Sequence, residues 1–228
     1  MRQFEAVIFD MDGLLLDTER IVLSAFLATC DQMGVRAQED LFLRCIGTNQ
    51  ALGRAVLKAG LQDQVDYLIF EQAWDRKYVE LTSERPVPLK DGALELLEHI
   101  ASMRIPVAVA TSTRTARACD KLKSSGILYR FQVVVGGDQV PNGKPAPDIY
   151  VKAAGALNAR AGRCLALEDS DNGVRAAVSA GMTVVQVPDL VQPSRDLLAL
   201  GHIVLGSLRE VAAYPFGRLA QDNCGSGR

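Results

Sequence analysis

The hydrophobic positions of the chain fall into short runs that are apolar throughout instead of alternating with polar residues. Five runs have the length and composition of strands: residues 5–10, 106–111, 132–135, 163–168 and 183–187. Strands that helices cover on both faces have this uninterrupted apolar character. The pattern therefore predicts a parallel sheet that is buried between two layers of helices.

Segments with the helical spacing of apolar residues lie between most of these runs. They cover residues 92–103, 113–125, 146–157 and 172–180. Strands that alternate with helices are typical of proteins in which helices pack on both faces of a parallel sheet. The predicted fold class is therefore α/β.

Residues 18–85 interrupt this alternation, because they contain no convincing strand. Amphipathic helices are predicted there at 19–34, 38–45, 49–60 and 64–83. This indicates an all-helical cap domain that is inserted after the first strand, with a return to the sheet through two prolines in residues 83–91. We expect a core domain of residues 1–16 and 87–215, a cap domain of residues 17–86, and a disordered tail of residues 216–228.

Composition and charge narrow the possible functions. The 228 residues carry a net charge of −2 and are 48% hydrophobic, so no basic field suggests a nucleic-acid partner. The apolar runs are shorter than the roughly 18 residues that span a bilayer, and the N-terminus lacks a signal-peptide pattern. Five scattered cysteines without a CxxC motif fit a reduced, cytoplasmic protein. We expect a monomer with neither a nucleic-acid nor a membrane partner.

The ends of the predicted strands carry most of the polar chemistry. The first strand ends in Asp10 and Asp12, the second in Thr111 and Ser112, and a later loop carries Lys144. The fourth strand ends in the sequence EDSD, residues 168–171. Ligands of open parallel sheets bind at the carboxyl ends of the strands, so these groups should gather on one edge. Each motif alone has a simpler explanation as a turn, a helix cap or a surface residue, but their combination in this order favours a site.

The chemistry of this group is that of metal-assisted phosphoryl transfer. Neighbouring carboxylates resist full ionisation unless a cation joins them, and the oxygen ligands of Asp10 and Asp169 suit Mg²⁺. An aspartate is a competent nucleophile toward phosphorus, and a second aspartate two residues later can act as general acid and base. Thr111 and Ser112 can hold phosphate oxygens, and Lys144 supplies positive charge.

These motifs together resemble the haloacid dehalogenase superfamily, in the branch with a helical cap. The matching segments are DMDGLLLDT at residues 10–18, Thr111 after its apolar strand, GKPAPD at 143–148 and EDSDNG at 168–173. The resemblance implies a Rossmann-like core, Mg²⁺ as cofactor and an aspartyl-phosphate intermediate. It implies Asp10 as the nucleophile and Asp12 as the acid/base. It also implies a metal site that is formed by Asp10, Asp12, Glu168 and Asp169.

The resemblance also separates the chemistries of this superfamily. Its dehalogenases and phosphonatases lack the second aspartate, which is present here as Asp12. Its β-phosphoglucomutases carry a histidine and a lysine in the cap where this chain has Val22 and Trp74. We therefore expect a Mg²⁺-dependent phosphatase that acts on a small phosphomonoester, either a sugar phosphate or a nucleoside or nucleotide phosphate. The alternatives are a phosphosugar mutase and a non-catalytic phosphate-binding protein on the same fold.

Substrate specificity should depend on the cap. The loop RCIGTN, residues 44–49, matches a cap loop that faces the leaving group in the similar enzymes. We expect Arg44, Gly47, Asn49 and Trp74 to shape specificity. The alternative is that Arg44 is a surface residue and that Trp74 belongs to the core of the cap.

Overall fold

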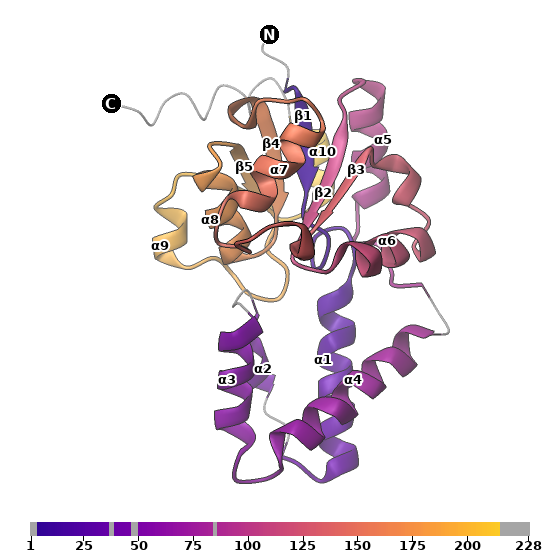
Figure 1. The fold of residues 1–228 in the computed structure, drawn as a ribbon, viewed down its shortest axis with the longest axis vertical. Helices are drawn as coiled ribbons and strands as arrows, with labels where there is room; N and C mark the ends of the chain where they lie inside the picture. Colours follow the sequence, from indigo (N-terminus) through magenta and orange to yellow (C-terminus); the bar gives the residue numbers. More distant parts are fainter. Residues whose placement is uncertain (1–3, 37–38, 47–49, 84–85, 215–228) are drawn as a thin grey trace.

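The computed structural model describes residues 4–36, 39–46, 50–83 and 86–214 (Figure 1). Six parallel strands form one sheet in the order β3-β2-β1-β4-β5-β6. They are β1 (Ala6–Phe9), β2 (Val107–Thr111), β3 (Val133–Gly136), β4 (Cys164–Glu168), β5 (Thr183–Gln186) and β6 (Ile203–Val204). The five predicted strands are confirmed to within two residues at each end, and the parallel α/β fold class is confirmed.

Each face of the sheet is covered by its own layer of helices. Val7 and Phe9 of β1 face a core that includes α5 (Ala93–Ser102), α6 (Thr115–Ser124) and α10 (Leu208–Ala213). Ala6 and Ile8 face the opposite core, with α7 (Asp148–Ala156), α8 (Asp171–Ser179) and α9 (Arg195–Leu198). Adjacent residues of one strand therefore enter different cores, which explains why the strand sequences are apolar without interruption.

Four helices between β1 and β2 pack around a third core. They are α1 (Thr18–Met33), α2 (Glu39–Leu43), α3 (Gln50–Leu61) and α4 (Tyr67–Ser83). Phe26, Phe42 and Phe70 are at most 3% exposed and form its centre. Figure 1 shows this helical unit beyond the carboxyl ends of the strands. The unit therefore lies next to the sheet edge at which ligands of parallel sheets bind.

The two segments that join the helical unit to the sheet run beside each other. Leu16 and Leu89 form an antiparallel bridge. The N–H of Asp17 donates to the carbonyl of Pro88 at 2.8 Å, and the N–H of Lys90 donates to the carbonyl of Leu15 at 2.9 Å. These contacts therefore hold the two connecting segments together where the helical unit meets the sheet.

The carboxyl-terminal part of the chain contains the elements that the sequence patterns did not predict. These are β6, α9 and α10, which are two, four and six residues long. Such short elements span too little chain to show a period of apolar residues. The predicted disordered tail, residues 216–228, lies outside the described residues. None of the described helices has the length and apolar character to cross a membrane.

Candidate active site

Three buried carboxylates meet at the carboxyl edge of the sheet. Asp10 follows β1, Glu168 is the last residue of β4, and Asp169 follows it. The parallel register pairs Phe9 with Leu167, which sets Asp10 beside Glu168. One oxygen of each carboxylate lies within 4.8 Å of the other two, and the three residues are 6%, 0% and 8% exposed. We call Asp10, Glu168 and Asp169 the acidic cluster.

Lys144 neutralises part of this negative charge. Its Nζ lies 2.5 Å from Asp10 Oδ1 and 2.5 Å from Glu168 Oε1, and its side chain is 5% exposed. Burial alone would lower the pKa of Lys144, but the Asp10 and Glu168 carboxylates outweigh this effect and raise it above its ordinary value. Lys144 is therefore a fixed ammonium at the side of the acidic cluster.

Burial and the negative charge that Lys144 does not neutralise raise the pKa values of Asp10 and Asp169. Burial raises the pKa of Asp10 to about 7, the carboxylates of Glu168 and Asp12 add to the effect, and Lys144 opposes it. Burial and the neighbouring Asp10 also raise the pKa of Asp169 well above its ordinary range. Three dry carboxylates face a single ammonium, so the cluster favours a further cation. Its hard oxygen donors are those that Mg²⁺ prefers, and the site fits that ion.

Glu168 is held by hydrogen bonds on both of its oxygens. Oε1 accepts from the hydroxyl of Tyr150 at 2.6 Å, besides its contact with Lys144. Oε2 accepts from the N–H of Asp169 at 3.1 Å and from the N–H and hydroxyl of Ser170 at 3.2 and 3.0 Å. The backbone of Gly173 passes so close that a Cβ there would collide with the Glu168 carboxylate. Glu168 therefore orients Lys144 and leaves no room for a side chain at position 173.

Asp12 stands outside the acidic cluster. Its Oδ2 accepts from the Thr113 hydroxyl at 2.7 Å, and its Oδ1 accepts from Lys121 Nζ at 2.7 Å. The chain turns directly after it at Gly13, whose φ of +85° is in the left-handed region. A Cβ on Gly13 would also collide with the Asp169 carboxylate. Asp10 and Asp12 thus lie in two different environments within three residues.

The predicted phosphate ligands come from the end of β2, the strand next to β1. Thr111 ends β2 with 1% exposure, and its hydroxyl accepts from the N–H of Thr113 at 3.1 Å. Ser112 is exposed and lines a pocket of about 400 Å³ together with Lys144 and Gly137. The structure thus brings Asp10, Thr111, Ser112 and Lys144 to the same edge of the sheet.

A second pocket lies between the sheet edge and the helical unit. Its volume is about 330 Å³, and Asp12 lies in its wall. The other lining residues come from α1, α4, α6 and the loop before α6, and they are Thr18, Glu19, Val22, Trp74, Asp75, Tyr78, Thr113, Arg117 and Lys121. We call this space the Asp12 pocket. It can receive the part of a substrate that lies beyond the reacting group.

The predicted cap residues have different positions. Trp74 lines the Asp12 pocket, and its ring also packs against Phe26 and Phe42 while its Nε1 donates to the carbonyl of Val22 at 3.1 Å. Trp74 therefore lines the pocket and also belongs to the core of the helical unit. Arg44 is exposed just after α2 and lines none of the pockets described above. Gly47 and Asn49 lie outside the described residues.

Three residues of the site were not predicted from the sequence. Tyr150 and Lys121 reach it from α7 and α6, and Glu19 reaches it from the first turn of α1. Burial raises the pKa of Glu19 to about 7, and the carboxylates of Asp12 and Asp189 add to the effect. None of the three belongs to a strand end, and only the helical spacing of Lys121 from Arg117 hinted at a shared face.

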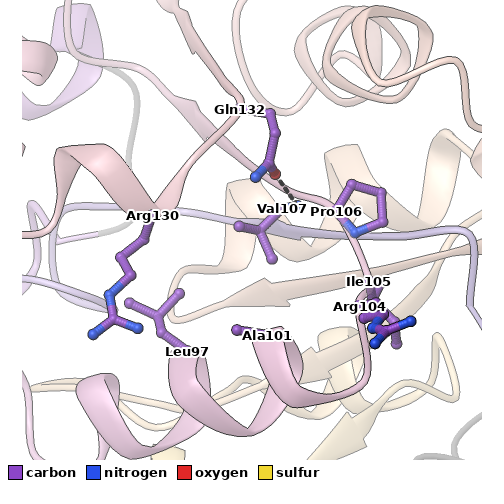
Figure 2. A pocket seen from close by; sticks show the side chains of 8 residues that line it. All are labelled: Leu97, Ala101, Arg104, Ile105, Pro106, Val107, Arg130 and Gln132. Atoms are coloured by element: carbon purple, nitrogen blue, oxygen red, sulfur yellow. Dashed lines mark hydrogen bonds between the residues drawn. The ribbon is translucent and has the colours of Figure 1, made fainter.

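Another pocket lies away from these groups and has different chemistry. Figure 2 shows this space of about 380 Å³ beside Leu97 and Ala101 of α5 and Val107, the first residue of β2. Gln132 Oε1 accepts from the N–H of Val107 there at 2.7 Å. It lies at the amino end of β2 and its lining contains no carboxylate, so it is not the candidate active site.

The fold and the site together define an α/β enzyme whose acidic centre lies at the carboxyl edge of a parallel sheet. Residues 7–187 match the haloacid dehalogenase-like hydrolase family. The chain is 35% identical over 212 residues to a phosphorylated carbohydrates phosphatase of Thermotoga maritima, covering 91% of this chain and 96% of that protein. It is 32% identical to a protein of Drosophila melanogaster named as a probable pseudouridine-5′-phosphatase, covering 95% of each.

Solved structures agree with these relatives. A HAD family hydrolase of Deinococcus radiodurans R1, solved with bound phosphate and sodium, is similar with a TM-score of 0.81 and 25% identity over the whole of both chains. The chain belongs to the haloacid dehalogenase-like hydrolase family. The family resemblance and the expectation of a hydrolytic enzyme are thereby confirmed.

Proposed function

We propose that this protein is a Mg²⁺-dependent phosphatase that hydrolyses a small phosphomonoester through an aspartyl-phosphate on Asp10. The observation that carries this proposal is the buried Asp10 carboxylate, which is held by Lys144 beside Glu168 and Asp169. The phosphatases among the relatives support the reaction class. A sugar phosphate or a nucleoside or nucleotide phosphate is the proposed substrate class.

The proposed metal site uses the acidic cluster. Asp10 and Asp169 would hold Mg²⁺ directly, with Glu168 assisting and Asp12 contributing from the adjacent turn. The bound ion would supply positive charge against the phosphoryl oxygens and so favour attack by an anionic nucleophile. Lys144 and Thr111 would hold oxygens of the phosphoryl group, with Ser112 at the mouth of the site.

The reaction that we propose has two steps. An oxygen of Asp10 forms a bond to phosphorus, the bond from phosphorus to the leaving oxygen breaks, and Asp12 gives its proton to that oxygen. Water then attacks the aspartyl-phosphate, Asp12 takes a proton from this water, and phosphate leaves while the Asp10 carboxylate is restored. The protonation state of Asp12 is thus the same before and after one turnover.

The helical unit has a proposed role in substrate selection. We propose that residues 17–86 are a cap domain that covers a core of residues 1–16 and 87–215 and excludes bulk water during the reaction. Trp74, which lines the Asp12 pocket, supports a role in specificity, and Arg44, Gly47 and Asn49 remain predictions for the same role. We further propose that the protein works as a monomer in the cytoplasm.

The mutase alternative differs in what happens to the phosphoryl group. Val22 lines the Asp12 pocket at the position where the similar mutases carry a histidine, and an apolar side chain there cannot donate a hydrogen bond. This supports transfer to water over transfer to a second hydroxyl of the substrate. A non-catalytic phosphate-binding protein would have no need for a buried nucleophile beside an acid/base.

The test is phosphate release across sugar phosphates, nucleotides and pseudouridine 5′-phosphate, with Mg²⁺ and with EDTA. We expect a preferred substrate, loss of activity with EDTA, and loss of turnover in Asp10→Asn. Formation of an isomeric sugar phosphate without release of phosphate would favour the mutase. Phosphate binding without any turnover would favour the non-catalytic protein.

A further inference from the structure

Lys121 has a position that the proposed mechanism does not yet use. It lies in α6, its side chain is 15% exposed, and its Nζ donates to Asp12 Oδ1 at 2.7 Å. Thr113 donates to the other oxygen of the same carboxylate at 2.7 Å. Each oxygen of Asp12 thus has one donor from the α6 side of the sheet edge. Rotation of the carboxylate about its terminal bond would break both hydrogen bonds at once.

This fixed orientation matters because Asp12 stands in the wall of a pocket. The Asp12 side chain is 22% exposed, and an isolated aspartate with that freedom has a broad choice of orientations. A general acid works only when its proton points to the leaving oxygen within hydrogen-bond reach. The donors that hold a carboxylate therefore affect the proton transfer without contacting phosphorus.

The helical unit contributes to the same arrangement. The ring of Tyr78, in α4, lies with its centroid 5.9 Å from Lys121 Nζ and 5.6 Å from the guanidinium carbon of Arg117. A cation near an aromatic face is attracted by the ring. The ammonium of Lys121 is thus placed between Asp12 of the sheet edge and an aromatic ring of the helical unit.

We propose that Lys121 is a positioning residue that orients the Asp12 carboxylate toward the leaving oxygen, and that Tyr78 supports it from the helical unit. The inference rests on the proposed function. Lys121 matters most where the leaving group needs a proton and least where the leaving group departs as a stable anion. The Lys121 hydrogen bond thus links the contact with Tyr78 of α4 to the proton-transfer step.

The test compares two aryl phosphates in Lys121→Met. Phenolate is a basic leaving group that benefits from protonation, whereas 4-nitrophenolate departs readily without it. General acid catalysis typically contributes about 10²–10⁴-fold, so we expect kcat for phenyl phosphate to fall by about 10–100-fold and kcat for p-nitrophenyl phosphate to fall by less than about 3-fold. Lys121→Arg keeps a donor and should recover part of the loss.

Lys123→Met is the matched control, since Lys123 is an exposed lysine of the same helix outside the Asp12 pocket. It should leave both rates within about 2-fold. Methionine has a helix propensity close to that of lysine, so both variants should fold, and circular dichroism would verify this. In an Asp12→Asn background, Lys121→Met should cause no further selective loss, because the group that it positions is already changed.

The outcomes are distinguishable. Equal losses for both substrates in Lys121→Met, or the same selective loss in Lys123→Met, would overturn the positioning role while the phosphatase proposal stands. A further selective loss in the Asp12→Asn background would overturn it as well. If the unmodified protein releases no phosphate from either aryl phosphate or from the metabolite panel, the proposed function fails and this inference fails with it.

Discussion

Mg²⁺ should stabilise this protein far more at pH 8 than at pH 5. Burial raises the folded-state pKa of Asp10 to about 7, above its ordinary value of 3.8. Without metal, a group with a raised pKa contributes stability below its unfolded pKa, and this contribution is lost as the pH rises through the folded pKa. Mg²⁺ needs the carboxylate, so it competes with this proton at low pH and meets much less competition at pH 8.

The size of the effect follows from the same pKa. At pH 5 a group with a pKa of about 7 is about 99% protonated, which weakens the apparent affinity for the ion roughly 100-fold. If Mg²⁺ is supplied at about 100 times its dissociation constant at pH 8, it stabilises by about 2.7 kcal/mol there and by about 0.4 kcal/mol at pH 5. For a protein of this size, these values correspond to Tm increases of about 5–10 °C and about 1 °C.

The assay is thermal unfolding at fixed ionic strength, with Mg²⁺ or EDTA, at several pH values from 5 to 8. The difference between the two Tm values at each pH cancels the titration of groups away from the site. Asp10→Asn is the control, because an amide does not titrate and its Mg²⁺-dependent Tm shift should lose the part of the pH dependence that comes from Asp10, while the part that comes from Asp169 stays. Equal shifts at pH 5 and pH 8, or none at either, would refute the reasoning about the acidic cluster.

Three further predictions concern residues around this cluster. Lys144→Met leaves buried carboxylates without their ammonium, so the free energy of unfolding in urea at pH 8 without metal should fall by about 3–5 kcal/mol; an unchanged midpoint would contradict this. Gly173→Ala places a methyl group on the Glu168 carboxylate and should lower both Tm and kcat, whereas Gly155→Ala in open space in α7 should raise stability by about 0.5–1 kcal/mol. Asp189 is a buried acceptor for Arg20 and Lys90, which lie where the helical unit joins the sheet, and Asp189→Asn weakens both contacts. This should lower the free energy of unfolding in urea by about 1–3 kcal/mol and change KM together with kcat. Unaltered kinetics would show that these contacts play no part in the proposed closure of the helical unit.

The main elements of the fold were predictable because the sheet is buried on both faces. Every residue of β1, β2, β4 and β5 is buried, so each strand appears in the sequence as a run of apolar or small residues, apart from Glu168 and Gln186 at the ends of β4 and β5. The carboxyl-terminal elements lack this signal. The two-residue strand β6 has one half-buried and one exposed residue, and the short helices α9 and α10 are marked mainly by their serine caps, Ser194 and Ser207.

The site was predictable where it follows strand ends and unpredictable where it comes from helix faces. Asp10 and Glu168 both follow from the rule that polar groups gather where parallel strands end, and they are direct neighbours because β1 and β4 are adjacent and in register. Lys121 lies 109 positions from Asp12, and their contact depends on which face α6 turns to the sheet edge. Glu19 likewise depends on the direction in which α1 leaves the turn at Gly13. The residues at the strand ends can thus be predicted from the sequence, whereas the helix residues that contact them depend on how the helices pack.

The charge balance of the cluster also suggests an order of binding. When ionised, the three carboxylates exceed the single ammonium of Lys144 by two negative charges in a dry environment. A phosphomonoester dianion that approached this site would meet repulsion from groups that solvent barely screens. A divalent cation held by the cluster would neutralise the excess, and Lys144 would then attract the phosphoryl group without net opposition. We therefore expect the metal to bind before the substrate, and we expect Asp10 to take part in both events.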